Sequence, residues 1–408
     1  MELDLIGAQP ALFGLYTQLA FVFHVPQTVL HTTLISSMLS GLDRLGKAFP
    51  WTAGQVVKTG SGLEDTPSYR IQHFESAPIL TVKDYRNDAQ VPTFAQMEEA
   101  GYPMSMLDES VWAPCPTIAS SAFDPSKPSG IGGDPAPVML VQISIIRDGL
   151  VLCINLQHNV CDMMGQAAVT GWLSKACRKE EFTREELDIG NVDRRTIVSP
   201  LSHEIIDVQD DLQYQLLATE PKPGDIAAPV PNKLEESTPT PAPPQCSWTY
   251  FKFSSASLQK LKSIASAGLP EDFTTFVSTD DALSAFIFES LLRARSQRLP
   301  SETRVTLARA MDARRYLNVR ADYPGILQNM TYTSYLLSEL MALPLGHIAA
   351  ALRKDINFET SSVARRTQSL ITFLSQDPAN LSKVSFTANQ DPGVDIALSS
   401  WTKVPAHC

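Results

Sequence analysis

The chain has 408 residues, 44% of them apolar, and its 33 basic against 44 acidic residues give a net charge of −11. This composition suits a globular protein of one large or two ordinary domains, and the acidic balance without a long basic run argues against nucleic-acid binding. No apolar stretch approaches the roughly 18 residues of a membrane span. The acidic start MELDL is also unlike a secretory signal. We therefore expect a cytoplasmic protein that binds neither nucleic acid nor a membrane.

The first half predicts a mixed α/β arrangement. Residues 32–49 carry an apolar stripe at helical spacing, and residues 137–146 have the composition of a strand. The glycine-rich segment 126–137 is followed by no helix, which favours a loop over a phosphate-binding turn. Residues 151–156 predict a further strand, and a helical stripe begins at Met164.

A proline-rich stretch divides the chain. Residues 218–245 hold eight prolines and almost no large apolar side chain, and proline breaks both helices and sheets. We expect a crossover linker over residues 218–247. It separates an N-terminal domain of residues 1–217 from a C-terminal domain of residues 248–408.

The second half predicts a strand over residues 249–253 and then two helices. The first helix ends at Gly268, a residue favoured at helix C-termini. The second begins with Ser278 and Asp281 in the spacing of a capping box. The stripe expected to be buried in this second helix comprises Leu283, Phe286, Ile287 and Leu291.

Six cysteines are scattered through the chain without C-x-x-C spacing, which argues against a zinc site and against a disulfide framework. We expect reduced thiols and no metal. Cys161 could be read as a nucleophile, but a small packing residue is the favoured interpretation. The cysteines are Cys115, Cys153, Cys161, Cys177, Cys246 and Cys408.

Two H-x-x-x-D patterns occur, and chance alone should supply roughly 0.4 of one. His203 and Asp207 follow a helix start at Pro200, where an i, i+4 pair is commonly a solvated charge pair. We interpret this pair as structural.

His158 and Asp162 differ because they follow a strand directly, and functional side chains concentrate where rigid elements open into loops. Histidine is well suited to accepting a hydroxyl or thiol proton near neutral pH. Asp162 is expected to fix the loop by pairing with an arginine. From this segment alone, a core histidine with its hydrogen bonds satisfied is an equally good interpretation of His158.

The segment HNVCDMMG, residues 158–165, resembles the H-x-x-x-D-x-x-G signature of the BAHD-type coenzyme A acyltransferases, and in particular their fungal trichothecene 3-O-acetyltransferase-like branch. The similarity extends along nearly the whole chain in the order found in the family. The other segments that carry it are LDLIGAQP, YTQ, STDDALSAFI, RAR, ARAMDARRYL, YPGILQNMTY and SSW.

The resemblance implies an α/β fold of two chloramphenicol-acetyltransferase-like domains, each a mixed sheet with helices, joined by a long crossover. It implies that His158 is the general base, that Asp162 is structural and that Gly165 lets the next helix pack closely. It also implies that the indole N–H of Trp401 helps to hold the oxyanion, although a core aromatic residue is the alternative. The residues that lie where the family meets coenzyme A are Ser254, Lys262, Ser399 and Ser400.

One family signature is missing. An Asp-Phe-Gly-Trp-Gly motif should follow SSW, but the sequence reads SSWTKVPAHC. The aspartate of that motif pairs with an arginine, so Arg314 is expected to lack its partner, and an uncompensated buried charge costs roughly 3 to 5 kcal/mol. The chain is then an active enzyme that closes its sheet differently, an inactive shortened relative, or an incomplete gene product.

The leading hypothesis is a monomeric O-acyltransferase that uses acyl-CoA, with acetyl-CoA favoured, as co-substrate and holds no permanent cofactor. Its acceptor would be an alcohol of a fungal secondary metabolite, acylated by direct transfer without a covalent enzyme intermediate. A non-enzymatic pseudoenzyme is one alternative. Another is a free-standing relative of condensation domains, although Gln157 and Met163 replace their second histidine and glycine.

Overall fold

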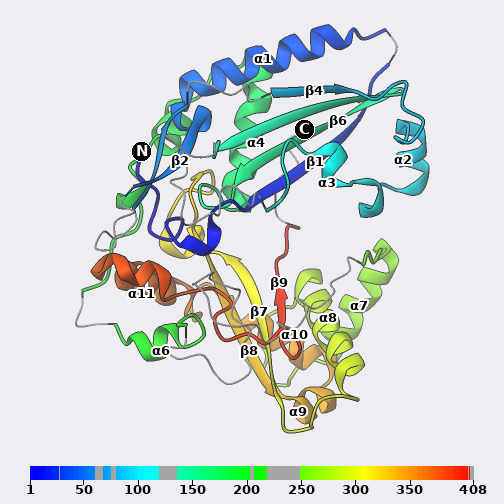
Figure 1. Ribbon diagram of the computed structural model, residues 1–408. Helices are drawn as coiled ribbons and strands as arrows, with labels where there is room; N and C mark the ends of the chain where they lie inside the picture. Colours follow the sequence, from blue (N-terminus) through cyan, green and yellow to red (C-terminus); the bar gives the residue numbers. More distant parts are fainter. Residues whose placement is uncertain are drawn as a thin grey trace, which may run out of the picture.

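The computed structural model describes residues 1–26, 28–59, 68–74, 80–118, 136–202, 206–217, 249–402 and 404. Figure 1 shows two lobes, the upper one built mainly from the first half of the chain and the lower one from the second half. None of the helices in these described ranges is long and apolar enough to cross a lipid bilayer.

The upper lobe is centred on a four-stranded sheet in the order β1-β6-β5-β4, antiparallel except for the β4–β5 pair. A separate antiparallel pair joins β2 and β3. The strands are β1 (Tyr16–His24), β2 (Gly54–Thr59), β3 (Ser68–His73), β4 (Leu80–Asp84), β5 (Met139–Ile146) and β6 (Gly149–Gln157). The helices of the first half are α1 (His31–Ala48), α2 (Phe94–Ala100), α3 (Glu109–Trp112), α4 (Met163–Cys177), α5 (Arg184–Gly190) and α6 (Val208–Leu212).

Strand β6 is central because both of its faces are covered. Ile154 and Leu156 pack into the same core as Val169 of α4, whereas Val151 belongs to a smaller core with Trp112 of α3. This period-two division follows from the pleat of a strand. The strand that leads to His158 is thereby fixed from both sides.

The lower lobe has a three-stranded sheet in the order β8-β7-β9, in which β7 and β9 run parallel. Its strands are β7 (Arg304–Asp312), β8 (Gln328–Leu336) and β9 (Ile396–Leu398). Its helices are α7 (Ser255–Ala267), α8 (Thr279–Arg295), α9 (Leu337–Ala342), α10 (Leu345–Lys354) and α11 (Val363–Gln376).

The largest core spans both halves of the sequence. It joins Leu156 and Val169 to Ile326 and Leu370, while a second core lies under α8 and α10. Helix α6 belongs to the first half but lies beside α11 (Figure 1), and Leu216 forms a β-bridge with Val384. The division into domains 1–217 and 248–408 therefore stays a prediction, because the largest core extends across that boundary.

Several predicted elements are confirmed. Helix α1 covers all but the last residue of the predicted segment 32–49, with Leu42 and Leu45 buried. Strands β5 and β6 and helix α4 lie where the sequence placed strands and a helix. Helix α7 ends against Gly268 as predicted. Most of the glycine-rich segment, the whole predicted linker over residues 218–247, His203, Cys246 and Cys408 fall outside the described residues.

The predicted strand over residues 249–253 is wrong. These residues form no ladder with another described segment, and Phe251 is 71% exposed. Alternation in a sequence shows that a segment can be a strand, but a strand forms only where another strand offers hydrogen-bond partners. Likewise, no helix starts at Pro200, because α6 begins at Val208 with Asp207 as its N-cap.

The predicted buried stripe of α8 is also wrong, because the nearly opposite face of the helix is buried. Phe286 and Leu291 are 37% and 40% exposed. The capping box of Ser278 and Asp281 is present, and the Asp281 carboxylate is completely buried against two arginines. This polar anchor lies on the face of the helix that packs inward. The apolar residues that face inward are Ala282, Ala285, Phe288 and Leu292.

Candidate active site

The H-N-V-C-D segment forms a tight turn between β6 and α4. The backbone N–H of His158 donates to the Leu15 carbonyl at 2.7 Å, and those of Val160 and Cys161 donate to the Gln157 carbonyl. Helix α4 then starts at Met163. The histidine is therefore held by backbone hydrogen bonds at the end of a rigid strand.

Asp162 closes this turn with four hydrogen bonds. As N-cap of α4 it accepts from the Gly165 N–H at 2.8 Å, and it also accepts from the Leu327 N–H at 2.8 Å. Arg314 donates to both carboxylate oxygens, at 2.9 and 2.8 Å. Asp162 thus pairs with an arginine, as the sequence led us to expect, and the pair joins the two halves of the chain.

Arg314 is not left without a partner, contrary to the sequence-based expectation. Besides Asp162, it contacts Asp312 at 2.8 Å and donates to the carbonyls of Tyr323 and Gly325. Its side chain is only 1% exposed. The expectation failed because it assigned Arg314 to the aspartate of the missing motif, whereas the H-x-x-x-D aspartate occupies its guanidinium.

Close packing reinforces this ion pair. A Cβ atom added to Gly165 would lie 2.1 Å from the Pro324 carbonyl oxygen, so only glycine allows α4 to approach the second half this closely. Asp4 adds a further link, since it accepts from the backbone N–H groups of Gly7 and Ile326. The turn that carries His158 is consequently clamped on both sides.

The His158 imidazole is largely buried, and its Nδ1 has no hydrogen-bond partner among the described residues. Burial lowers its pKa, while its own backbone carbonyl and the charge of Asp162 oppose that shift. The net effect favours the neutral ring, which is the form that accepts a proton. Cys161 is 1% exposed, and burial raises the pKa of its thiol to about 12, so it lacks the thiolate character of a nucleophile.

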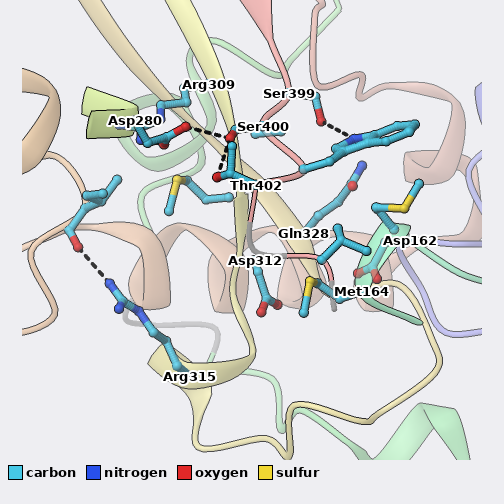
Figure 2. A pocket seen from close by; sticks show the side chains of 16 residues that line it. Asp162, Met164, Asp280, Arg309, Asp312, Arg315, Gln328, Ser399, Ser400 and Thr402 are labelled. Atoms are coloured by element: carbon cyan, nitrogen blue, oxygen red, sulfur yellow. Dashed lines mark hydrogen bonds and ion pairs between the residues drawn. The ribbon is translucent and has the colours of Figure 1, made fainter. Parts of the chain in front are cut away.

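A cavity of about 180 Å³ opens next to this turn, between α4, β7 and the segment after β9 (Figure 2). The structure brings Asp162, Ser399, Ser400 and Trp401 together around it, while His158 is not among its lining residues. The lining residues are Asp162, Met163, Met164, Asp280, Arg309, Ala310, Met311, Asp312, Arg315, Gln328, Ile356, Ser399, Ser400, Trp401, Thr402 and Val404.

Ser254 and Lys262 do not join this cavity. Both are exposed, Lys262 on α7 and Ser254 as its N-cap, where the Ser254 hydroxyl accepts from the Ser257 N–H at 3.1 Å. Trp401 is 48% exposed, and its indole N–H donates to the Ser399 hydroxyl at 3.1 Å. It is therefore a cavity-lining residue and not the core aromatic of the alternative interpretation.

Sequence reasoning missed six polar lining residues: Asp280, Arg309, Asp312, Arg315, Gln328 and Thr402. Asp280 lies beside the capping residue Asp281, and nothing in the spacing distinguishes a carboxylate that faces a cavity from one at a solvated helix start. The two adjacent aspartates in STDD could have indicated a second role for this segment, since a capping box needs only one of them.

Comparisons with known proteins place the chain in a family. The model of the Trichothecene 3-O-acetyltransferase-like N-terminal domain matches residues 15–177, and that of the Transferase family matches residues 104–407. The chain belongs to the Transferase (BAHD) family and is an acyltransferase of its trichothecene 3-O-acetyltransferase-like branch.

Curated relatives agree with this placement. The chain is 41% identical over 404 residues to trichothecene 3-O-acetyltransferase TRI101 of Fusarium sporotrichioides, covering 99% of this chain and 82% of the relative. It is 36% identical over 406 residues to the trichothecene 3-O-acetyltransferase of Saccharomyces cerevisiae, covering 100% and 82%.

Solved structures confirm the predicted two-domain fold. F. sporotrichioides TRI101 complexed with coenzyme A and T-2 superposes with a TM-score of 0.84 at 39% identity, over 99% of this chain and 84% of that one. F. graminearum TRI101 complexed with coenzyme A and deoxynivalenol gives 0.86 at 38% identity, with the same coverage. Vinorine synthase, at 13% identity and a TM-score of 0.54, shares the fold alone.

Proposed function

We propose that the protein transfers an acetyl group from acetyl-CoA to a hydroxyl group of a fungal secondary metabolite, with His158 as general base. The observation that carries this proposal is the state of His158. It is a largely buried imidazole with a lowered pKa, fixed at the end of β6 by the clamp between Asp162 and Arg314. The relatives that are acetyltransferases and bind coenzyme A support the choice of donor.

The proposed reaction is a direct transfer. His158 takes the hydroxyl proton as the acceptor oxygen attacks the thioester carbonyl, and a tetrahedral oxyanion forms. When the carbon–sulfur bond breaks, the imidazolium returns the proton to the departing thiolate. No covalent acyl-enzyme is needed, which agrees with the buried, protonated thiol of Cys161.

Trp401 is the proposed donor to the oxyanion, supported by its place on the lining of the cavity. Its indole N–H would have to exchange the Ser399 hydroxyl for the oxyanion as charge develops. A donor of this kind commonly contributes about 3 kcal/mol to barrier lowering. Ser399 and Ser400 from the same segment, together with Ser254 and Lys262 on α7, are the proposed contacts of coenzyme A.

The test combines binding with transfer. Calorimetric titration of acetyl-CoA should show binding, and release of free coenzyme A should follow addition of hydroxylated metabolites, with deoxynivalenol as the first acceptor. We expect His158→Ala to lower kcat about 100-fold or more. His24→Ala, which changes an exposed histidine at the end of β1, should leave kcat unchanged.

Two outcomes would overturn the proposal. If the chain binds acetyl-CoA and the wild type and His158→Ala transfer the acetyl group at equal rates, His158 is not the general base. A folded chain that neither binds acetyl-CoA nor acylates any acceptor would favour a pseudoenzyme.

We also propose that the protein acts as a monomer in the cytoplasm, with acyl-CoA and a small alcohol as its partners. The acidic composition and the scattered cysteines support this view. Light scattering after size-exclusion chromatography should give a mass near 44.7 kDa. A mass of twice that value would refute the monomer.

A further inference from the structure

The segment that carries Trp401 leaves the sheet with few attachments. Strand β9 ends at Leu398, opposite Arg309 of β7. Beyond it, the Trp401 indole donates to Ser399, and the Ser400 hydroxyl lies 3.1 Å from that of Thr402. These contacts remain within the segment and do not fix its place relative to the cavity.

One side-chain hydrogen bond ties residues 399–402 to another element in the described part of the chain. The Ser400 hydroxyl donates to Oδ1 of Asp280 at 2.6 Å, across 120 positions of sequence (Figure 2). Asp280 is the second residue of α8, so its carboxylate also lies at the positive end of the helix dipole. The acceptor of this bond is therefore held by a helix that is itself anchored in the second core.

Asp280 is in turn held in place by Arg309. The Arg309 guanidinium contacts the second carboxylate oxygen of Asp280 and donates to Asp281 at 3.1 Å, and its side chain is 4% exposed. Asp281 adds Arg353 and both polar groups of Ser278 to the cluster. Each charged side chain of this cluster has a partner of opposite charge, which restricts its motion.

We infer that Asp280 is a positioning residue for acyl transfer, which fixes the Trp401 segment at the cavity through Ser400. This inference rests on the proposed function, in which the indole N–H of Trp401 donates a hydrogen bond to the oxyanion. The required accuracy is high, since a misplacement of about 1 Å at a reacting group costs on the order of 100-fold in rate. A tryptophan that is half exposed gains little fixation from packing and depends on this polar anchor.

The first measurement is hydrogen exchange of the peptide covering residues 396–404, detected by mass spectrometry in the full chain. We expect faster exchange in Asp280→Ala and in Ser400→Ala. Glu289→Ala should match wild type, because it removes a carboxylate–arginine pair from the same helix without touching Ser400. If Asp280→Ala does not fold, Ser400→Ala still tests the inference, because it leaves the charged cluster of Asp280, Asp281, Arg309 and Arg353 complete.

The second measurement is a double-mutant cycle on kcat. Asp280→Ala and Ser400→Ala should each lower kcat about 10-fold. Only Asp280→Ala, which removes no proposed coenzyme A contact, is expected to keep its KM for acetyl-CoA within about 3-fold of wild type. In a Trp401→Phe background, which should itself be slower by about 100-fold, either change should have no further effect. Asp280→Asn keeps an acceptor for Ser400 and should restore most of the kcat lost in Asp280→Ala.

The outcomes distinguish a failure of the positioning role of Asp280 from a failure of the oxyanion role of Trp401. Unchanged exchange in both anchor variants overturns the positioning role, whatever the rates. Faster exchange together with additive losses in the Trp401→Phe background also overturns it, because Asp280 would then act elsewhere. If Trp401→Phe has wild-type kcat, the oxyanion assignment under the proposed function fails, and the catalytic part of this inference fails with it.

Discussion

Replacing Arg314 by alanine should cost more stability than any surface charge change in this chain. Its guanidinium supplies two of the four hydrogen bonds to the Asp162 carboxylate and also binds the carbonyls of Tyr323 and Gly325. Asp162 and Arg314 are 3% and 1% exposed, so the charge left on Asp162 would stay largely shielded from solvent.

The expected loss can be estimated in two ways. Breaking a buried ion pair from one side costs roughly 3 to 5 kcal/mol, because the remaining charge stays buried. Counting instead two charge-assisted hydrogen bonds at about 1.5 to 3 kcal/mol each gives a similar range. A native chain is stable by only about 5 to 15 kcal/mol, so the variant should lose a large share of its stability.

Urea unfolding followed by tryptophan fluorescence measures this loss. The control is Arg320→Ala, which breaks a carboxylate–arginine contact of 2.7 Å with Asp322 on the surface and should cost about 0 to 1 kcal/mol. Adding Asp162→Asn to Arg314→Ala should cost less than the sum of the single changes, because it removes the stranded charge. A loss for Arg314→Ala within about 1 kcal/mol of the control would refute the reasoning.

Three further predictions follow from the same turn. Cys161→Ala should leave kcat within about 3-fold of wild type, since the thiol is buried and its pKa is raised to about 12; a loss equal to that of His158→Ala would contradict the general-base assignment. Gly165→Ala should destabilise the protein by about 1 to 3 kcal/mol in urea unfolding, because its Cβ would meet the Pro324 carbonyl oxygen at 2.1 Å; wild-type stability would show that α4 can move away. Because burial lowers the pKa of His158 and only the neutral ring accepts a proton, kcat/KM should rise with pH below about 6.5 and be flat above it; a rise confined to pH above 7 would exclude His158 as that base.

The parts of the site that are local in sequence could be predicted from the sequence. The end of β6, the cap of α4 at Asp162 and the glycine at Gly165 lie within nine residues, and strand periodicity, capping preference and glycine packing each act over such distances. The sequence also led us to expect that some arginine would pair with Asp162. The identity of that arginine could not be predicted, because Arg314 lies 152 positions away and no local rule connects the two.

The errors share a physical cause. The strand expected over residues 249–253 required a partner strand, and the buried face of α8 required knowledge of the arginines that hold Asp281 inward. Periodicity reports which residues can share a face but not which face meets the core when a buried polar anchor competes. Asp280 escaped notice for the same reason, since Ser400 is its partner only after folding.

The end of β7 connects the two sides of the proposed reaction centre. Arg309 holds Asp280 and through it the segment of Trp401, while Arg314, just beyond the strand, holds Asp162 and through it the turn of His158. Residues 309–312 between them line the cavity. Because Arg309 and Arg314 lie only five positions apart, a displacement of the end of β7 would move the anchors of the base and of the oxyanion donor together. The end of this strand therefore contributes to the relative geometry of His158 and Trp401, which lie 243 positions apart in the sequence.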